Sequence, residues 1–326
     1  MTSSSHPTVS VIIPNWNGKH LLPACLDSLR GQTFRDFETV VVDNGSKDGS
    51  VELLREQYPE VRLLALPINR FFAGAVNHGI KETRSPIVAL LNNDAEAEPA
   101  WLEALVHGLA NHPRCGMAAS KILLYDRPDV LNSAGDFVRL DGIPGNRGVW
   151  ERDLGQYDDQ TDVFGACAGA AAYRRSLFDE IGYFDEEYLA YCEDVDLNFR
   201  ARLAGFECVF VPEARVHHRL SATGGGPLAS YLCGRNFIRL AATNMPGSLI
   251  RRYWPRIVLA QLKLLGESLR HFREPAARAR VRGQLAGLAS LTSVGKKRRV
   301  VQSLRKVPDV QIEALLAAAD HPRSQQ

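Results

Sequence analysis

Several common features are absent from this chain of 326 residues. Its six cysteines are scattered and form no Cys-x-x-Cys pair, which argues against a disulfide framework and a structural zinc site. No uncharged apolar run reaches about eighteen residues, so no membrane-spanning helix is predicted. The first residues lack the charged and apolar regions of a signal peptide. These absences predict a protein of a reducing cytoplasm.

Two nucleotide-binding signatures are also missing. No Gly-x-Gly-x-x-Gly follows a predicted strand, which argues against a dehydrogenase. The segment after the first predicted strand, Pro14-Asn15-Trp16-Asn17, is not a Gly-rich phosphate loop with a basic residue. A nucleotidylyltransferase is therefore disfavoured as well.

The net charge of +2 conceals an uneven distribution. Residues 228–326 contain 18 Lys and Arg against 5 Asp and Glu, a net charge of +13. The remaining 21 basic and 32 acidic residues give residues 1–227 a net charge of −11. An acidic body with a basic tail predicts two surfaces that serve different partners.

Strand and helix signals alternate in the first third of the chain. Aliphatic runs predict buried strands, and apolar residues spaced by three and four predict helices. The predicted strands are 9–13, ended by Pro14, then 37–42, 61–66 and 86–91, and the predicted helices are 20–30, 49–57, 73–83 and 99–110. This alternation predicts an α/β fold with a doubly wound, mostly parallel, Rossmann-like sheet.

The pattern is looser after residue 115. The predicted elements are strands at 116–124, 135–140 and 209–211, the last ended by Pro212, and a helix at 194–204 followed by Gly205. Residues 165–172 carry almost no side-chain bulk, and Gly224 to Pro227 is a natural hinge. We therefore divide the chain into an α/β domain, residues 1–223, and a basic, mainly helical region, residues 224–326.

Polar residues follow two predicted strands at the point where each strand ends. Asp43 comes after strand 37–42, and Asn92-Asn93-Asp94 follows strand 86–91. Ligands of such sheets bind outside the carboxyl ends of the strands. A carboxylate there can bind a nucleoside or hold a hard cation against phosphate oxygens. An ordinary turn explains Asp43 equally well, whereas the preceding strand favours a site at Asp94.

Glu193 and Asp194 lie at a predicted helix N-terminus. A carboxylate there can be a general base if it faces a cleft, and the helix dipole would stabilise its ionised form. Taken alone, the segment Glu193-Asp194 fits a simple N-cap better than a catalytic site.

Two weaker sets complete the candidates. His217 and His218 follow the last predicted strand and could complete a metal site begun at Asp94, or could be inert surface residues. Asn69 and Asn77 lie at a loop-to-helix junction that could meet phosphate.

In combination and in this order, the motifs closely resemble the family 2 inverting glycosyltransferases with a GT-A fold. The sequence is most similar to the branch that contains rhamnosyltransferases and other polysaccharide glycosyltransferases. The segments that carry the resemblance are 9–18 (VSVIIPNWNG), 42–50 (VDNGSKDGS), 69–79 (NRFFAGAVNHG), 91–94 (LNND), 169–175 (GAAAYRR), 182–186 (GYFDE), 193–197 (EDVDL) and 216–218 (VHH). The segment 231–236 (YLCGRN) is similar to that branch too, though less distinctively.

The resemblance implies a role for each residue. Asp194 would be the general base, supported by Glu193. Asp94 would hold Mg²⁺ or Mn²⁺ on the donor diphosphate, together with His218 or His217, and the spacing to Ser221 favours His218. Asp43 would bind the nucleobase, and the donor nucleotide site would include Pro14, Asn15, Asn69, Asn77, Asn92 and Asn93.

The implied activity is a metal-dependent inverting glycosyl transfer in cell-surface polysaccharide biosynthesis. The donor would be a UDP- or dTDP-sugar, and the acceptor a glycan or a polyprenyl-linked glycan. The family's metal clamp is Asp-x-Asp, but this chain has Asn92 at the first position. That departure leaves an alternative, a catalytically inactive nucleotide-sugar-binding or scaffold protein of a polysaccharide assembly complex.

The basic tail has two interpretations. Apolar residues at helical spacing lie beside Arg251, Arg252, Tyr253 and Trp254, a composition that suits a helix on an anionic membrane surface. The protein would then be peripheral on the inner face of the plasma membrane. Alternatively, the tail is a helical cap with a solvated basic face. No recognised nucleic-acid-binding module accompanies the charge, so no nucleic-acid partner is predicted.

Overall fold

The computed structural model describes residues 6–219 and 225–320. The first elements are β1 Val9–Asn15, α1 Leu22–Arg30, β2 Phe37–Asp43, α2 Ser50–Gln57, β3 Arg62–Ala65, α3 Phe71–Glu82 and β4 Ile87–Leu91. They are followed by β5 Ala95–Ala97, α4 Trp101–Asn111, β6 Cys115–Leu124, β7 Leu131–Ser133, β8 Asp136–Val138, β9 Pro144–Asn146, β10 Ala170–Arg174, α5 Arg175–Ile181, a 3₁₀ turn Glu186–Tyr188, α6 Glu193–Leu203 and β11 Glu207–His218. The last helices are α7 Gly226–Asn244, α8 Gly247–Arg270, α9 Pro275–Ser303 and α10 Asp309–Ala318.

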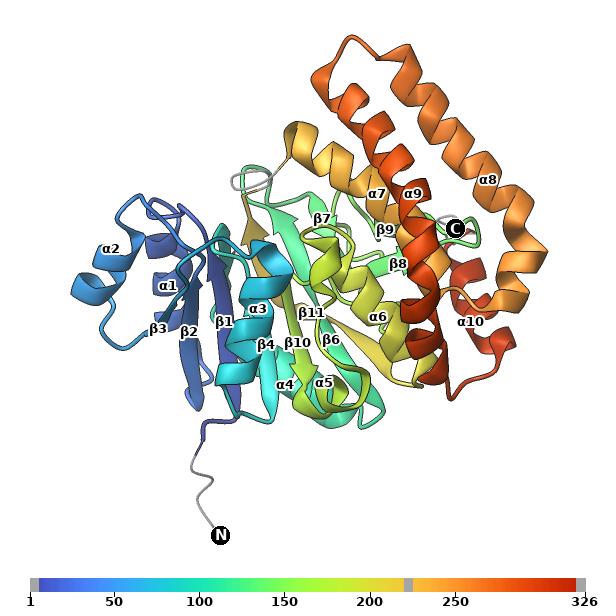
Figure 1. The fold of residues 1–326 in the computed structure, drawn as a ribbon. Helices are drawn as coiled ribbons and strands as arrows, with labels where there is room; N and C mark the ends of the chain where they lie inside the picture. The colour runs from blue at the N-terminus through green and yellow to red at the C-terminus, as the bar shows by residue number, and fades with distance from the viewer. Residues whose placement is uncertain (1–5, 220–224, 321–326) are drawn as a thin grey trace.

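One central sheet organises the chain before α7 (Figure 1). Its strand order is β3-β2-β1-β4-β10-β6-β11-β5, with β7 paired to β6. The strands β3, β2, β1 and β4 are parallel, while β10 runs antiparallel between β4 and β6. Asn15 lies opposite Asp43, and Ala170 lies opposite Leu91. The carboxyl ends of β1, β2 and β4 therefore meet at one edge of the sheet, beside the start of β10.

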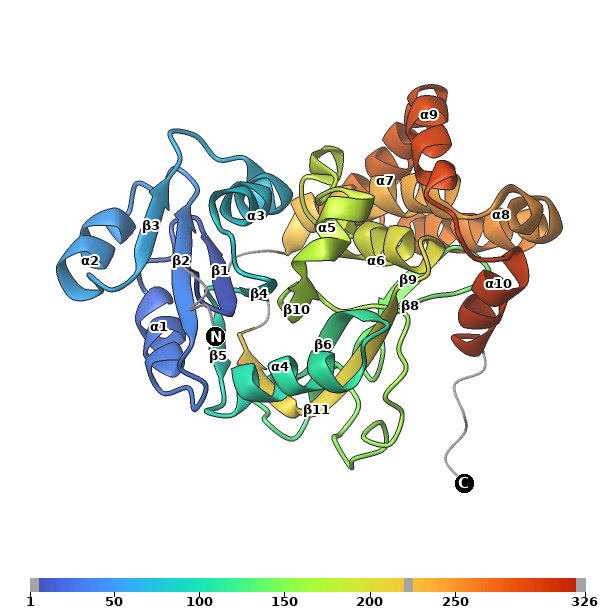
Figure 2. The same ribbon diagram turned by 90° about the horizontal axis from the view of Figure 1, so that it is seen from below.

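Both faces of the sheet are buried, which explains the aliphatic runs. Side chains alternate between the faces of a strand, so Val11 and Ile13 of β1 pack into one core and Ile12 packs into another. Figure 2 shows α1 and α4 on one face of the sheet and α3, α5 and α6 on the other. The expected doubly wound architecture is confirmed, with a sheet that mixes parallel and antiparallel pairs.

The C-terminal helices share a third core with the sheet-bearing part. Phe199 of α6, Leu240 of α7 and Ile312 of α10 are all buried in it. The expected helical extension is thus present and is packed against α6 (Figure 1). Across residues 6–219 and 225–320, no helix combines the length and the apolar composition that a membrane crossing requires.

Two strands are longer than the sequence pattern indicates. β1 continues through Pro14 to Asn15, because its pairing with β4 stops at Ile12 and only the pairing with β2 passes the proline. β11 continues through Pro212 to His218, and its pairing with β6 shifts register between Val211 and Arg215, which accommodates the proline. The prediction that these prolines end their strands is wrong. The expected boundary at residues 223 and 224, and Ser221, lie outside the described residues.

Candidate active site

A buried chain of polar side chains crosses the carboxyl ends of three strands. Asn15 Nδ2 donates to Asp43 Oδ1 at 3.0 Å, and Asn15 Oδ1 accepts from Asn93 Nδ2 at 2.8 Å. The other carboxylate oxygen of Asp43 accepts from the backbone N–H of Ser46 at 3.0 Å. All three side chains are almost fully buried. The sequence-predicted residues Asn15, Asp43 and Asn93 are therefore brought together, and the turn expected at Asp43 is present as well.

Gly18 allows the loop after β1 to cover this chain. A Cβ atom at residue 18 would lie 2.2 Å from Asn93 Nδ2 and 2.4 Å from Asn15 Oδ1. A side chain there would displace these two bonded amide groups, so glycine allows the close approach. Pro14 precedes the group on β1 and is half-buried.

A second polar cluster joins the loop after β2 to the start of α3. Asn44 Nδ2 donates to Asn69 Oδ1 at 2.9 Å, and Asn44 Oδ1 accepts from the backbone N–H of Arg70 at 2.7 Å. Asn69 is among the site residues predicted from the sequence, whereas Asn44, which follows Asp43 directly, is not. Two exposed aromatic side chains are Trp16, just after β1, and Phe71, the first residue of α3.

Asn77 is not part of either cluster. Its Nδ2 donates to the backbone oxygen of Phe184 at 2.9 Å, and its Oδ1 accepts from the N–H of Phe184 at 3.0 Å. These bonds join α3 to the loop before the 3₁₀ turn. Asn77 therefore makes an internal contact in the structure, away from Asn15 and Asp43.

The structure distinguishes the two histidines at the end of β11. His218 Nε2 lies 3.1 Å from Asp94 Oδ1, and its Nδ1 lies 3.0 Å from Asn132 Oδ1. His217 points to the other side, where its Nε2 lies 3.1 Å from Glu98 Oε1. The alternation of side chains along β11 thus brings His218, and not His217, to Asp94. Asn132 on β7 is a partner that the sequence analysis missed.

The donor atoms at Asp94 and His218 fit a divalent cation. An amide oxygen only accepts hydrogen bonds, so His218 Nδ1 donates to Asn132 Oδ1. The other ring nitrogen, Nε2, then faces the carboxylate of Asp94. A divalent cation between Nε2 and the carboxylate would be bound by both groups. Within the described residues, no three His, Cys, Asp or Glu side chains are grouped to hold a metal ion. Mg²⁺ sites commonly use one or two protein ligands and complete the coordination with substrate phosphates and water.

The start of β10 connects Asn92 to Asp194. The backbone N–H of Asn92 donates to the oxygen of Gly169 at 2.9 Å. One residue earlier, the N–H of Ala168 donates to Asp194 Oδ2 at 3.2 Å. Asp194 Oδ1 also accepts from the N–H of Val195 at 2.8 Å, at the start of α6. The small-residue segment therefore brings Asp194 close to the end of β4.

Among the carboxyl groups near the start of α6, the three with shifted pKa values are Asp194, Glu193 and Asp136 of β8. Burial raises the pKa of Asp194, but its bonds from the N–H groups of Ala168 and Val195 act in the opposite direction. Burial, and then the charge of Asp194, raise the pKa values of Glu193 and Asp136 well above their ordinary values. Glu193 and Asp136 are buried, whereas Asp194 is half-buried. Asp194 is therefore the carboxyl group of the three that best carries a negative charge.

The residues that donate hydrogen bonds to Asp136 were not predicted from the sequence either. Asn146 Nδ2 donates to Asp136 Oδ1 at 2.8 Å, and Asn198 Nδ2 donates to Oδ2 at 3.2 Å. Asn198 lies on α6, one helical turn after Asp194. Single Asp and Asn residues in short strands or within a helix carry no periodic signal that could have found them.

Comparison with known proteins identifies the family. A family model described as glycosyl transferase family 2 matches residues 10–182, more than half of the chain. The chain belongs to glycosyl transferase family 2. Within the family, it is 30% identical over 241 residues to the N-acetylglucosaminyl-diphospho-decaprenol L-rhamnosyltransferase of Mycobacterium tuberculosis. That match covers 67% of this chain and 78% of the relative.

Two further matches define how far the likeness extends. The chain is 31% identical over 236 residues to an uncharacterised protein of Sinorhizobium fredii. The match covers 67% of this chain but 25% of that protein. The chain thus spans a quarter of the length of this relative. A solved structure that is similar to this chain is a mannosyltransferase from Pyrobaculum calidifontis in complex with GDP-Man and Mn²⁺. The match covers 99% of this chain and 89% of the mannosyltransferase chain, with a TM-score of 0.56 and 17% sequence identity. The shared fold confirms the expected GT-A type architecture.

Proposed function

We propose that this chain is an inverting glycosyltransferase that moves a sugar from a nucleoside-diphosphate donor to a hydroxyl group of a glycan or lipid-linked glycan. The observation that carries the proposal is the convergence of Asp43, Asp94 and Asp194 at one edge of the sheet. The link from Asn92 through Gly169 and Ala168 to Asp194 supports it, because it joins the donor side to a partly exposed carboxylate. Family membership supports the same reaction class.

The reaction follows from the residues. Asp194 accepts the proton of the acceptor hydroxyl, whose oxygen attacks the anomeric carbon. The bond from that carbon to the diphosphate oxygen breaks in the same step, and the nucleoside diphosphate leaves. Such a displacement inverts the anomeric centre and needs a base on the acceptor side. Glu193, buried and with a raised pKa, supports the helix start without taking that proton.

The donor would lie over the ends of β1, β2 and β4. Asp43 and Asn15 would bind the nucleoside, with Pro14, Asn69, Asn92 and Asn93 around it. Asp94 and His218 would hold Mg²⁺ or Mn²⁺, which neutralises charge on the leaving diphosphate when bound. Asn132 would orient His218, since metal-ligating histidines usually donate their other ring N–H to an oxygen. The Mn²⁺ in the mannosyltransferase of the same fold supports this choice of ion.

The relatives suggest the substrates and the setting. By analogy with the mycobacterial enzyme, we propose a UDP- or dTDP-sugar such as a rhamnosyl donor, a polyprenyl-linked acceptor and a role in polysaccharide biosynthesis. Residues 1–223 would carry the donor site and residues 224–326 would form the helical region. The reaction would take place in the cytoplasm, at the inner face of the plasma membrane.

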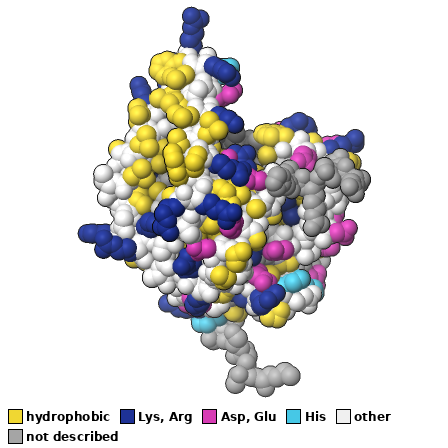
Figure 3. All heavy atoms as spheres, turned by 90° about the vertical axis from the view of Figure 1, so that its right-hand side faces the viewer, with side chains coloured by type: hydrophobic (Ala, Val, Ile, Leu, Met, Phe, Trp, Pro, Cys, Tyr) yellow, Lys and Arg dark blue, Asp and Glu magenta, His cyan; other side chains and the backbone are white. Residues whose placement is uncertain are grey.

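A membrane surface is the partner we propose for the helical region. α8 exposes Trp254, Val258, Leu259, Leu262 and Leu269 along one side. Figure 3 shows hydrophobic side chains gathered on this face with Lys and Arg around them. Residues 247–303 contain 13 Lys and Arg against 2 Glu, so the surface is complementary to anionic lipid.

A donor screen tests the proposed function. The purified full chain is incubated with Mn²⁺, a polyprenyl-diphosphate acceptor and a panel of UDP-, dTDP- and GDP-sugars, and released nucleoside diphosphate is measured. We expect release from one donor, dependent on the acceptor. Tight binding of a donor without release from any member of the panel would instead support the inactive scaffold protein that Asn92 suggests.

A further inference from the structure

The segment directly before Asp194 has an unusual backbone. Leu189, Tyr191 and Cys192 have φ angles of 67°, 65° and 69°. Residues with a Cβ atom rarely adopt this left-handed region, because the side chain crowds the backbone. Cys192 is the N-cap residue of α6, so this conformation sets where Glu193 and Asp194 begin. Interactions elsewhere must hold the segment in place.

Asn236 of α7 supplies those interactions. Its Nδ2 donates to the backbone oxygens of Tyr188 at 3.1 Å, Ala190 at 3.1 Å and Tyr191 at 2.8 Å. The side chain is completely buried, and its Oδ1 accepts from Arg235 Nη1 at 3.2 Å. One asparagine amide thus holds the carbonyl groups on both sides of Leu189. A side chain without an N–H group at this position would leave these carbonyl groups without that donor.

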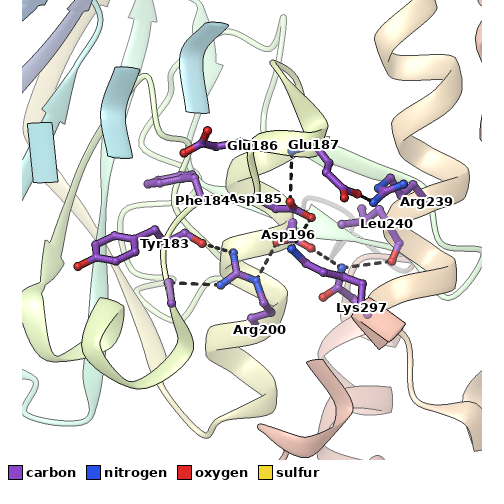
Figure 4. A network of polar contacts seen from close by, with 12 residues as sticks. Tyr183, Phe184, Asp185, Glu186, Glu187, Asp196, Arg200, Arg239, Leu240 and Lys297 are labelled. Carbon is purple, nitrogen blue, oxygen red and sulfur yellow. Dashed lines mark hydrogen bonds and ion pairs between the residues drawn. The ribbon is translucent and has the colours of Figure 1, made fainter. Parts of the chain in front are cut away.

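The start of the same segment is held by neighbouring arginines. Arg235 Nη1 donates to the backbone oxygen of Glu187 at 2.7 Å, and Arg239 forms an ion pair with the Glu187 carboxylate. Figure 4 shows Glu187 pointing toward Arg239 on α7, beside the network around Asp196 and Arg200. α7 therefore contacts the chain continuously from Glu187 to Tyr191.

α7 is itself firmly positioned. A Cβ atom at Gly234 would lie 2.5 Å from the backbone oxygen of Arg280, and one at Gly283 would lie 2.0 Å from that of Tyr231, so α7 and α9 cross in direct backbone contact. At its other end, Asn244 Nδ2 donates to Asp196 Oδ1 of α6 at 2.8 Å. Lys297 of α9 pairs with Asp185 at 2.9 Å, as Figure 4 shows. α7 is thus packed against α9 and bonded to α6.

We propose that Asn236 is a positioning residue for Asp194: it holds the left-handed segment before α6 and thereby aims the carboxylate at the acceptor. This inference rests on the proposed role of Asp194 as general base. It makes the helical region necessary for turnover, independently of any membrane contact. The donor contacts of Asn15, Asp43 and Asn93 lie on other elements, so donor binding does not depend on Asn236.

The test compares Asn236→Ala with Asn244→Ala in the full chain. Both variants remove a buried asparagine amide of α7 that bonds to the sheet-bearing part, but only the first frees residues 188–191. We expect kcat of Asn236→Ala to fall by about 10²-fold, the effect of misplacing a reacting group by about 1 Å, with the donor KM within about twofold of normal. Asn244→Ala should keep kcat near the unmodified value while losing thermal stability.

The pH profile gives a readout that a merely structural role would not change. The hydrogen bonds from the backbone N–H groups of Ala168 and Val195 lower the pKa of Asp194. A displacement of Asp194 that breaks these hydrogen bonds therefore raises that pKa. Since the base must be ionised, the acid limb of kcat should move to higher pH in Asn236→Ala and stay in place in Asn244→Ala. If Asn236→Ala does not fold, Asn236→Ser keeps one donor and should shift the limb in the same direction with a smaller loss of kcat.

Two results would overturn the inference. One is a normal kcat for Asn236→Ala. The other is an equal loss of kcat in both asparagine variants with no movement of the acid limb. Asp194→Asn is measured in parallel: if it stays active, the proposed role of Asp194 as the base fails, whereas an inactive Asp194→Asn beside a fully active Asn236→Ala rejects only the positioning role.

Discussion

The neighbouring carboxyl groups of Glu193 and Asp194 at the start of α6 differ in their surroundings. The difference favours the neutral form of one and the ionised form of the other. Asp194 receives two backbone N–H bonds, which favour its ionised form. Glu193 Oε2 is buried and lacks a hydrogen-bond partner in the described structure, so the protonated form of Glu193 is favoured. We therefore expect this adjacent pair of acidic residues to have two roles, Asp194 as an anion and Glu193 as a neutral side chain.

The raised pKa of Glu193 predicts how stability depends on pH. Its stabilising contribution is fully present below its ordinary pKa of 4.5 and is lost as pH rises through the raised value of the folded state. Glu193→Gln should therefore flatten the fall in the free energy of unfolding above pH 4.5, by up to about 1.4 kcal/mol per pH unit, the value for one proton. Urea unfolding measured from pH 4 to pH 9 checks this. An unchanged slope would show that Glu193 is ionised in the folded protein.

A cation between Asp94 and His218 predicts that donor binding needs a metal. Calorimetry of the nucleoside diphosphate should show tighter binding with Mn²⁺ than with EDTA. Asn132→Ala removes the partner of His218 Nδ1 and should weaken Mn²⁺ binding by about 10- to 100-fold, the usual effect of losing such a partner. His217→Ala is the matched control and should bind normally, because His217 faces Glu98. Equal affinities with Mn²⁺ and EDTA would remove the metal role from both Asp94 and His218.

At the scale of elements, the loop into β10 joins the two halves of the site. Its backbone groups form hydrogen bonds with Asn92 on one side and Asp194 on the other. A Cβ atom at Gly165 would lie 2.2 Å from Asn198 Cγ, and Asn198 in turn holds Asp136. The packing of α6 against this loop thus depends on glycine at residue 165.

Gly165→Ala should therefore destabilise the protein by about 1–3 kcal/mol, the usual cost of overpacking a core, and should lower turnover. Gly266→Ala on α8 is the control, because a Cβ atom at residue 266 would have no neighbouring atom within 4 Å. That substitution should stabilise the protein by about 0.5–1 kcal/mol, since alanine favours a helix. Chemical denaturation of both variants measures the difference. A stable, fully active Gly165→Ala would show that the loop tolerates displacement.

The parallel half of the fold was predictable because its strands are buried on both faces and appear as aliphatic runs. β10 was not, since Ala170-Ala171-Ala172 has no hydrophobic period and its strand conformation comes from β4 and β6 on either side. Asp43, Asp94 and Asp194 were found because each follows a recognisable strand or begins a helix. Asn132, Asp136 and Asn236 act through partners distant in sequence, and nothing in their local sequence indicates those contacts.

At the scale of the whole molecule, the positive charge of the C-terminal region has more than one use. Lys297 pairs with Asp185, and Arg298 donates to the backbone oxygens of Ala242 and Met245, so both stabilise packing. Arg251, Lys263 and Arg270 are exposed on α8 beside the apolar side chains. Both interpretations of the tail therefore have support: part of it is a packed helical cap, and α8 retains a surface suited to lipid.

Vesicle flotation tests that surface. We expect the full chain to bind phosphatidylglycerol vesicles, to bind phosphatidylcholine poorly, and to dissociate as salt rises, since charge attraction is screened within about 8 Å at physiological ionic strength. Replacing Arg251, Lys263 and Arg270 with Gln should weaken binding roughly a hundredfold, at about 1 kcal/mol for each charge. The same change at Arg55, Lys81 and Arg84, exposed on the other part of the molecule, is the control. No flotation, with a concentration-dependent dimer that Leu259→Ser disrupts, would assign the face to a second copy of the chain instead.

The most direct test of the catalytic proposal is to measure turnover and donor affinity together in Asp194→Asn. The proposal predicts donor affinity near normal and turnover lower by roughly two to four decades, the usual contribution of a general base. Glu193→Gln, measured beside it, should retain most of its turnover because burial raises the pKa of Glu193 and favours its neutral form. Normal turnover in Asp194→Asn, with Glu193→Gln inactive, would contradict the assignment and move the base to Glu193.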